Sequence, residues 1–168
     1  AGYYVEREFY INDAGNQINN LAASVNARYL EQLGQTVEFP ENGYHGHDII
    51  ETAERIVRIY GDKFLNMSEE ERLQEFRTIA LKEKLAALKE DLEAFNVTYD
   101  EWFSEQTLHD AKAIHSACDL LTERGYLYEQ DGALWLKATE YGDDKDRVVI
   151  RDNGVPTYFA ADIAYHQD

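Results

Sequence analysis

The chain has 168 residues, of which 44% are hydrophobic, enough for one domain with a sizeable core or for a large part of a bigger domain. Its 33 acidic and 16 basic residues give a formal net charge of −17, which disfavours tight binding of nucleic acid by this chain alone. A single cysteine excludes an internal disulfide. No apolar run approaches the roughly 18 residues of a membrane span, so we expect a cytoplasmic protein without a membrane partner.

The first third of the chain predicts a strand followed by two helices. Residues 3–11 (YYVEREFYI) are rich in aromatic and β-branched side chains, which favours a strand that ends at NDAGNQ. Apolar residues at steps of three and four over 18–33 predict a helix that stops at Gly34. A second helix is predicted from about Asp48 to the residue before Gly61.

The middle of the chain is predicted to be mostly helical. Ser68 and Glu71 match a capping box, in which each side chain satisfies a backbone N–H at the start of a third helix. The segment Leu81–Phe95 places apolar residues at a 4,3,4,3 spacing, a narrow stripe suited either to an internal helix contact or to a partner helix. After the aromatic segment VTYDEWFSE, apolar spacing predicts a fourth helix over 108–121.

The last third returns to strands. Asp131–Gly132 stands between two apolar runs, a strong signal for a two-residue hairpin turn. The segment RVVIRDNGVPTYF predicts a second hairpin with a longer turn, and AADIAYH resumes helical spacing. We therefore predict a mixed α/β chain with a mostly helical insertion and C-terminal β-hairpins. If the first and last parts share one sheet, the helical middle is inserted between them.

The segment HGHD offers His45, His47 and Asp48 as candidate metal ligands. Alternate residues of an extended segment point to one side, so one ion could bridge the two histidines. Further ligands would have to come from elsewhere, and surface or capping roles are the alternative. Because the sequence also lacks a P-loop, a GxGxxG segment and a GxSxG elbow, it assigns no metal ligand and no catalytic residue.

Tyr158 and Asp162 form the most informative pair of side chains. If a helix begins near Tyr158, the two lie four residues apart on one face. A carboxylate accepts paired N–H bonds from a planar cation, and a phenol adds a hydrogen bond or a ring face, so the pair suits a guanidinium group. The alternative is structural, with Asp162 favouring a helix N-terminus while Tyr158 packs.

Two long segments resemble the catalytic domain of bacterial arginyl-tRNA synthetases, which are class I aminoacyl-tRNA synthetases. They are VEREFYINDAGNQINNLAASV and GDDKDRVVIRDNGVPTYFAADIAYH, and FPENGYHGHDII and WFSEQTLH are similar as well. The resemblance implies part of a nucleotide-binding, Rossmann-like catalytic domain. Residues 1–34 and 126–168 would then belong to the catalytic core, and residues 35–125 to the helical insertion.

In that family, arginine and ATP form arginyl-adenylate, and the arginyl group then passes to the 3′-terminal adenosine of tRNA(Arg). The resemblance implies that Tyr158 and Asp162 match the family's Y-x-x-x-D pattern, which contacts the guanidinium of arginine. It also places four residues at the end of a core strand beside the catalytic cleft, namely Asn12, Asp13, Gly15 and Gln17. For Asp13 the alternative is a helix N-cap.

The family's HIGH-type motif and KMSKS-type loop do not occur in this sequence, and neither do its tRNA-reading domains. The resemblance therefore implies an internal fragment that supplies arginine recognition and is inactive alone, because groups that hold phosphate are lacking. ATP and Mg²⁺ are expected for the parent enzyme, without an assigned residue here. The alternative is a free-standing acidic module that docks a helix on the Leu81–Phe95 stripe.

Overall fold

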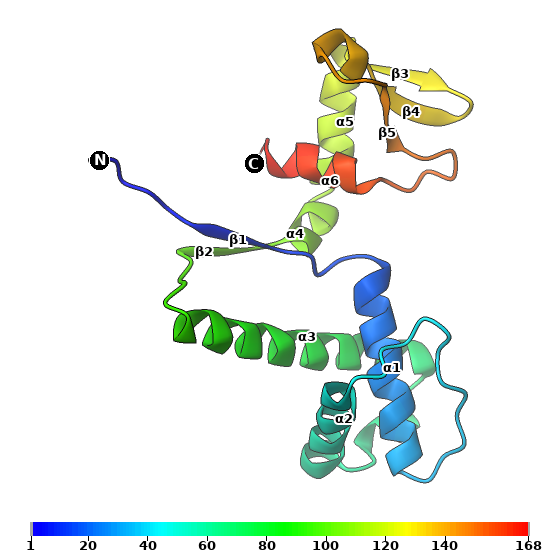
Figure 1. Ribbon diagram of the computed structural model, residues 1–168. Coiled ribbons are helices and arrows are strands. Elements are labelled where there is room, and N and C mark those ends of the chain that lie inside the picture. Colours follow the sequence, from blue (N-terminus) through cyan, green and yellow to red (C-terminus); the bar gives the residue numbers. More distant parts are fainter. Residues whose placement is uncertain (1, 168) are drawn as a thin grey trace. The chain divides into compact units, whose positions relative to one another are not determined.

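The computed structural model describes residues 2–167, which form two compact units (Figure 1). Unit 1 contains residues 13–101 and the N-terminal segment up to Phe9, and unit 2 contains residues 10–12 and those from Trp102 onward. The boundaries fall inside two strands, β1 (Glu8–Ile11) and β2 (Glu101–Ser104), which pair into a two-stranded sheet.

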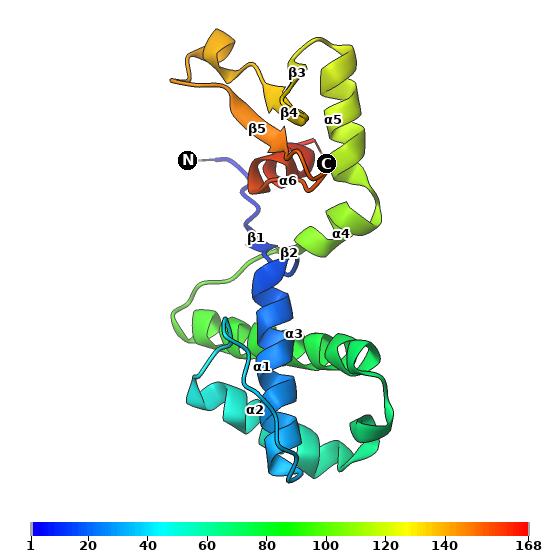
Figure 2. The same cartoon turned by 90° about the vertical axis from the view of Figure 1, so that its right-hand side faces the viewer.

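Unit 1 is helical, and most of its helix boundaries agree with the sequence prediction. Its elements are α1 (Asn16–Gln32), α2 (His47–Tyr60), the 3₁₀ turn η1 (Lys63–Asn66) and α3 (Glu69–Ala94). Helix α1 packs against both α2 and α3 (Figures 1 and 2). Gly34 closes α1 as predicted: at φ 77° it adopts a conformation that favours glycine, and its N–H donates to the carbonyl oxygen of Glu31.

Three aromatic side chains form the centre of unit 1. The rings of Tyr29 and Phe76 lie 4.9 Å apart and those of Phe64 and Phe76 5.1 Å apart, all three being at most 1% exposed. The edge-to-face geometry is the preferred one for such rings. The Tyr29 hydroxyl donates to the carbonyl oxygen of Gly61 at 2.9 Å, so its polar end is satisfied.

The start of α3 confirms the predicted capping box. The Glu71 N–H donates to the Ser68 hydroxyl at 3.3 Å, and the Ser68 N–H donates to the Glu71 carboxylate at 3.0 Å. We expect Ser68→Ala to lower the free energy of unfolding by about 1 kcal/mol, because a first-turn N–H loses its acceptor. Urea denaturation followed by far-UV circular dichroism measures this loss.

Thr78→Ala is the matched control, since Thr78 donates to the Gln74 carbonyl oxygen inside the same helix. Alanine is the better helix former at an interior position, so this variant should not lose stability. An equal loss in both variants would contradict the role given to the cap.

Only the first half of α3 contributes fully buried residues. Arg72, Phe76 and Ala80 are buried, whereas the leucines of the Leu81–Phe95 stripe are half-buried and Phe95 is 82% exposed. The stripe is thus neither core nor plain solvated surface. The internal-contact and partner-helix alternatives for it both stay predictions.

Unit 2 combines helices with an antiparallel sheet. Its elements after β2 are α4 (Glu105–Asp110), α5 (Ala113–Glu123), β3 (Leu127–Gln130), β4 (Ala133–Leu136), the 3₁₀ turn η2 (Ala138–Tyr141), β5 (Arg147–Ile150) and α6 (Tyr158–Tyr165). Strand β4 lies between β3 and β5, with α5 against β3 and α6 against β5. The core between helices and sheet is built from Leu108, Ile114, Ala117, Val149, Ala160 and Ala164.

The C-terminal hairpins are confirmed in part. Asp131 and Gly132 adopt φ values of 52° and 79°. Positive φ values at both positions give a two-residue turn whose twist matches that of the flanking strands. The second hairpin is reduced to one bridge between Ile150 and Pro156. Hydrogen bonds flank this bridge on both sides, from the Arg151 N–H to the Val155 carbonyl oxygen at 3.0 Å and from the Thr157 N–H to the Val149 carbonyl oxygen at 2.9 Å. The pairing goes no further because α6 begins at Tyr158.

Two further predictions are wrong in their extent. The strand predicted over 3–11 is formed only over Glu8–Ile11, because only this part pairs with β2 and a strand needs such a partner. The single helix predicted over 108–121 is two helices, α4 and α5. The break lies at Lys112, whose φ of 55° is left-handed and cannot continue an α-helix.

The mixed α/β class is confirmed, but the hypothesis that the first and last parts share one sheet is wrong for the described part of the chain. Strand β1 pairs with β2, and β3, β4 and β5 form a separate sheet. Sequence periodicity identifies strands without naming their neighbours, which is why the prediction failed. The division into 1–34, 35–125 and 126–168 stays a prediction. Among residues 2–167, no helix combines the length and apolar character that a membrane span requires.

Candidate functional site

Tyr158 and Asp162 lie one helical turn apart on α6, as their spacing predicts. The first turn of α6 is anchored to β5 by Thr157, whose hydroxyl donates to the Val148 carbonyl oxygen at 2.9 Å and accepts from the Ala160 N–H at 3.4 Å. Tyr158 is 63% exposed, so it does not pack in the core, and Asp162 lies outside the first turn. The structural alternative for the pair therefore has little support.

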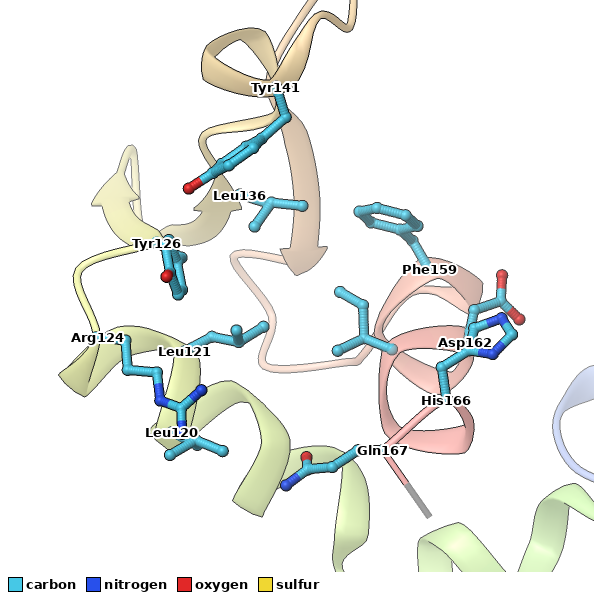
Figure 3. A pocket seen from close by; sticks show the side chains of 11 residues that line it. Leu120, Leu121, Arg124, Tyr126, Leu136, Tyr141, Phe159, Asp162, His166 and Gln167 are labelled. Atoms are coloured by element: carbon cyan, nitrogen blue, oxygen red, sulfur yellow. The ribbon is translucent and has the colours of Figure 1, made fainter.

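The two side chains line neighbouring hollows of unit 2. Asp162 lines an open pocket with a volume of about 760 Å³ between α5, β4 and α6 (Figure 3). Tyr158 lines a smaller hollow of about 460 Å³ beside β5. Phe159 contributes to both, so the hollows adjoin at the first turn of α6.

The larger pocket has an apolar wall and a polar rim. Figure 3 shows Phe159 on α6 facing it across from Tyr141, whose ring contacts that of Tyr126 at 6.1 Å. Asp162 and His166 lie next to each other on α6 at the rim. The remaining lining residues are Leu120, Leu121, Arg124, Leu136, Ile163 and Gln167. Such a surface suits a ligand with a methylene chain and a cationic head.

The smaller hollow contains two guanidinium groups. Arg147 donates from Nε and Nη2 to the two carboxylate oxygens of Asp143, at 2.6 and 2.7 Å, and Nη2 also lies 3.0 Å from Asp144. These bonds keep the pKa of the Asp143 carboxyl well below its usual range. Arg151 donates from Nη1 to the Pro156 carbonyl oxygen at 3.3 Å.

Sequence reasoning missed Arg147 and Arg151 as neighbours of Tyr158. The signal was present, because residues four apart in an extended segment point to the same side, and RVVIR places an arginine at each end. The turn that returns the chain from Arg151 to Tyr158 is what brings the ring to them. That return follows from the tertiary structure.

Of the residues predicted beside the cleft, Asn12, Asp13 and Gly15 lie in the link between β1 and α1, and Gln17 is the second residue of α1. Asn12, Gly15 and Gln17 are exposed, and Asp13 is buried, with its carbonyl oxygen accepting from Arg77 at 3.0 Å. The N-cap alternative for Asp13 is wrong, because Gly15 occupies the cap position and no side chain caps the helix. Asp13 precedes the cap by two residues. The cleft-lining role of these residues stays a prediction.

Gln17 lines a third pocket, of about 350 Å³, in unit 1. It shares this pocket with Tyr44, His45 and the ion pair of Asp48 with Lys84. The segments NDAGNQ and GYHGHD, far apart in the sequence, therefore meet here. The hydrogen bond from Lys84, 2.7 Å long, lowers the pKa of the Asp48 carboxyl.

The candidate metal ligands of HGHD have other contacts. His45 packs on the ring of Phe39 at 4.6 Å, and His47 lies 3.6 Å from Glu51. Asp48 bonds Lys84. Across residues 2–167, no group of three or more His, Cys, Asp or Glu side chains is arranged to hold a metal ion. No step involving Mg²⁺ is assigned to the described residues.

Comparisons with known proteins agree over the whole chain. The family model described as "tRNA synthetases class I (R), catalytic domain" matches residues 1–168. Arginine–tRNA ligases from Carboxydothermus hydrogenoformans and Moorella thermoacetica are 59% and 57% identical over 168 residues, all of this chain. The chain spans 30% of the length of these two relatives.

Solved structures give the same result. An arginyl tRNA synthetase structure from Campylobacter jejuni superposes with a TM-score of 0.86 at 38% identity, covering 99% of this chain and 36% of that one. Arginyl-tRNA synthetase from Plasmodium falciparum, with a TM-score of 0.57 at 13% identity, shows the shared fold alone. The chain belongs to the family of class I tRNA synthetases (R), as part of the catalytic domain.

Proposed function

We propose that this chain is part of an arginine–tRNA ligase and that it supplies recognition of the arginine side chain. In the proposed reaction, the arginine carboxylate attacks ATP to give arginyl-adenylate and pyrophosphate. A ribose hydroxyl at the 3′ end of tRNA(Arg) then takes the arginyl group and releases AMP. The family match and the names of the relatives support this assignment.

The observation that carries the arginine role is the placement of Asp162 on α6. Its carboxylate lies at the rim of a pocket whose wall is apolar, and Tyr158, one turn earlier on α6, is exposed and lines the adjoining hollow. The apolar wall suits the methylene groups of arginine, and the carboxylate suits the guanidinium. An uncharged analogue would leave the carboxylate unpaired, which is the source of discrimination.

We expect Asp162→Asn, in the full-length enzyme that carries this sequence, to raise the KM for arginine by about 10- to 100-fold, because a charge-assisted pair of hydrogen bonds is lost. The KM for ATP should change by less than about twofold. Steady-state aminoacylation kinetics measure both constants. Asp119→Asn, which removes the same charge from an exposed position of α5, is the control.

If Asp162→Asn raised both KM values equally, the residue would be structural and the arginine role would fall.

A separate expectation concerns the 168-residue chain by itself, which contains no HIGH-type or KMSKS-type sequence. It should show no arginine-dependent exchange of pyrophosphate into ATP, since stabilisation of phosphate charge supplies much of such catalysis. Exchange above background would contradict this.

A further inference from the structure

We propose that the hollow lined by Arg147, Arg151 and Tyr158, here called the arginine groove, binds a phosphodiester of the single-stranded 3′ end of tRNA. The inference rests on the proposed function, because it takes tRNA as the partner. It adds a contact site for that partner on a chain whose overall charge opposes RNA binding.

The two guanidinium groups are held in place with donors to spare. Asp143 fixes Arg147 through Nε and Nη2, and the Pro156 carbonyl oxygen holds Nη1 of Arg151. Within residues 2–167, Nη1 of Arg147 and Nη2 of Arg151 carry no hydrogen bond. A guanidinium oriented by one partner loses little further freedom when it binds a phosphate oxygen with its remaining N–H groups.

Electrostatics favours this place for a phosphate over the surface in general. The formal charge of −17 repels a phosphate backbone wherever acidic residues dominate. The groove is lined by two arginines and one acid, Asp143, which is already paired with Arg147. Asp144 also contacts Arg147 from outside the groove, so Arg151 is the cation with less acidic competition.

The position of the groove matches what the transfer step requires. The 3′-terminal ribose can accept the arginyl group only if the RNA end and the amino acid lie side by side. The groove adjoins the pocket of Asp162, since Phe159 lines both. A phosphodiester held by Arg151 would therefore place the last nucleotides next to the proposed arginine site.

The test measures binding of a fluorescent single-stranded RNA oligonucleotide to the 168-residue chain by anisotropy across a series of salt concentrations. We expect weak binding at low salt, and Arg151→Gln should weaken it by about tenfold. The slope of log affinity against log salt should fall by about 0.7, the value for one phosphate contact on a single strand. Arg151→Lys keeps the charge and should retain the slope.

Arg58→Gln is the matched control, an exposed arginine on α2 whose replacement changes net charge equally. It should leave the affinity within about twofold, as expected for a charge outside the contact. Equal losses in Arg58→Gln and Arg151→Gln would overturn the groove and leave only a net-charge effect. Absence of RNA binding by the unaltered chain at low salt would overturn it as well.

Competition by ATP and the KM for arginine are two further measurements that distinguish the alternatives. If ATP displaced the RNA and its own affinity fell in Arg151→Gln as much as that of the RNA, the groove would be a triphosphate site and the RNA assignment would fall. In the full-length enzyme, Arg151→Gln should leave the KM for arginine unchanged. If only Asp162→Asn had its expected effect, the groove would be rejected while the arginine role stood. The reverse result would reject the arginine role alone.

Discussion

Phe76→Ala should lower the free energy of unfolding by about 3–5 kcal/mol, the largest effect expected in unit 1. The ring is fully buried and contacts both Tyr29 and Phe64, so truncation removes apolar contacts and leaves a cavity among aromatic side chains that cannot all move to fill it. A loss of this size is a large share of the stability of a typical domain. Urea denaturation followed by far-UV circular dichroism reports it, because α1, α2 and α3 are the longest helices.

Phe95→Ala provides the comparison at the far end of α3. Its side chain is 82% exposed at the C-cap, and truncation there should change stability by less than about 0.5 kcal/mol. If the two variants were equally destabilised, burial at Phe76 would not explain the loss. A strongly destabilised Phe95→Ala would further show that the Leu81–Phe95 stripe is covered in solution.

Asn26→Ala should cost about 2–3 kcal/mol, more than a typical polar substitution. Arg72 is 9% exposed and Asn26 is 6% exposed, and Nε of Arg72 donates to the side-chain oxygen of Asn26 at 2.6 Å. Nη1 of Arg72 donates to the Met67 carbonyl oxygen at 3.3 Å. Without Asn26, a buried charged donor loses its acceptor, and the desolvation penalty of that donor remains.

The double variant Asn26→Ala/Arg72→Met separates this mechanism from simple loss of packing. Removing both partners avoids the unpaired donor, so the double variant should be less destabilised than the sum of the single ones, with a coupling of about 1 kcal/mol or more. Strict additivity would argue against the pair. Asn19→Ala, at an exposed site on the same helix, should be close to neutral.

Local signals in the sequence were sufficient for the elements whose contacts are local. The capping box at Ser68, the stop at Gly34 and the turn at Asp131–Gly132 were predicted because each depends on residues a few positions apart. The pairing of β1 with β2 was not predictable in this way. It joins segments that are distant in the sequence. Next to the paired strands, for example, the backbone N–H of Arg7 donates to the carboxylate of Asp100, 93 residues later, at 2.8 Å.

The candidate site shows the same division. Spacing alone placed Tyr158 and Asp162 on one face of a helix, and the structure confirms that they share α6. Spacing could not show that they line adjoining hollows, since the walls come from α5, β4 and β5. Asp13 was ambiguous for a related reason. A carboxylate before a helix is compatible with capping, and only the backbone at Gly15 decides against it.

The way the chain is divided between the two units has a consequence for the order of folding during synthesis. All the helices of unit 1 lie in the continuous stretch 13–101, so its core can close as soon as that stretch has left the ribosome. Unit 2 takes residues 10–12 from before that stretch, and these must wait for Trp102 and everything after it. If unit 1 has already folded by then, it shortens the loop that unit 2 must close, which lowers the entropic cost of bringing residues 10–12 to their late-made partners.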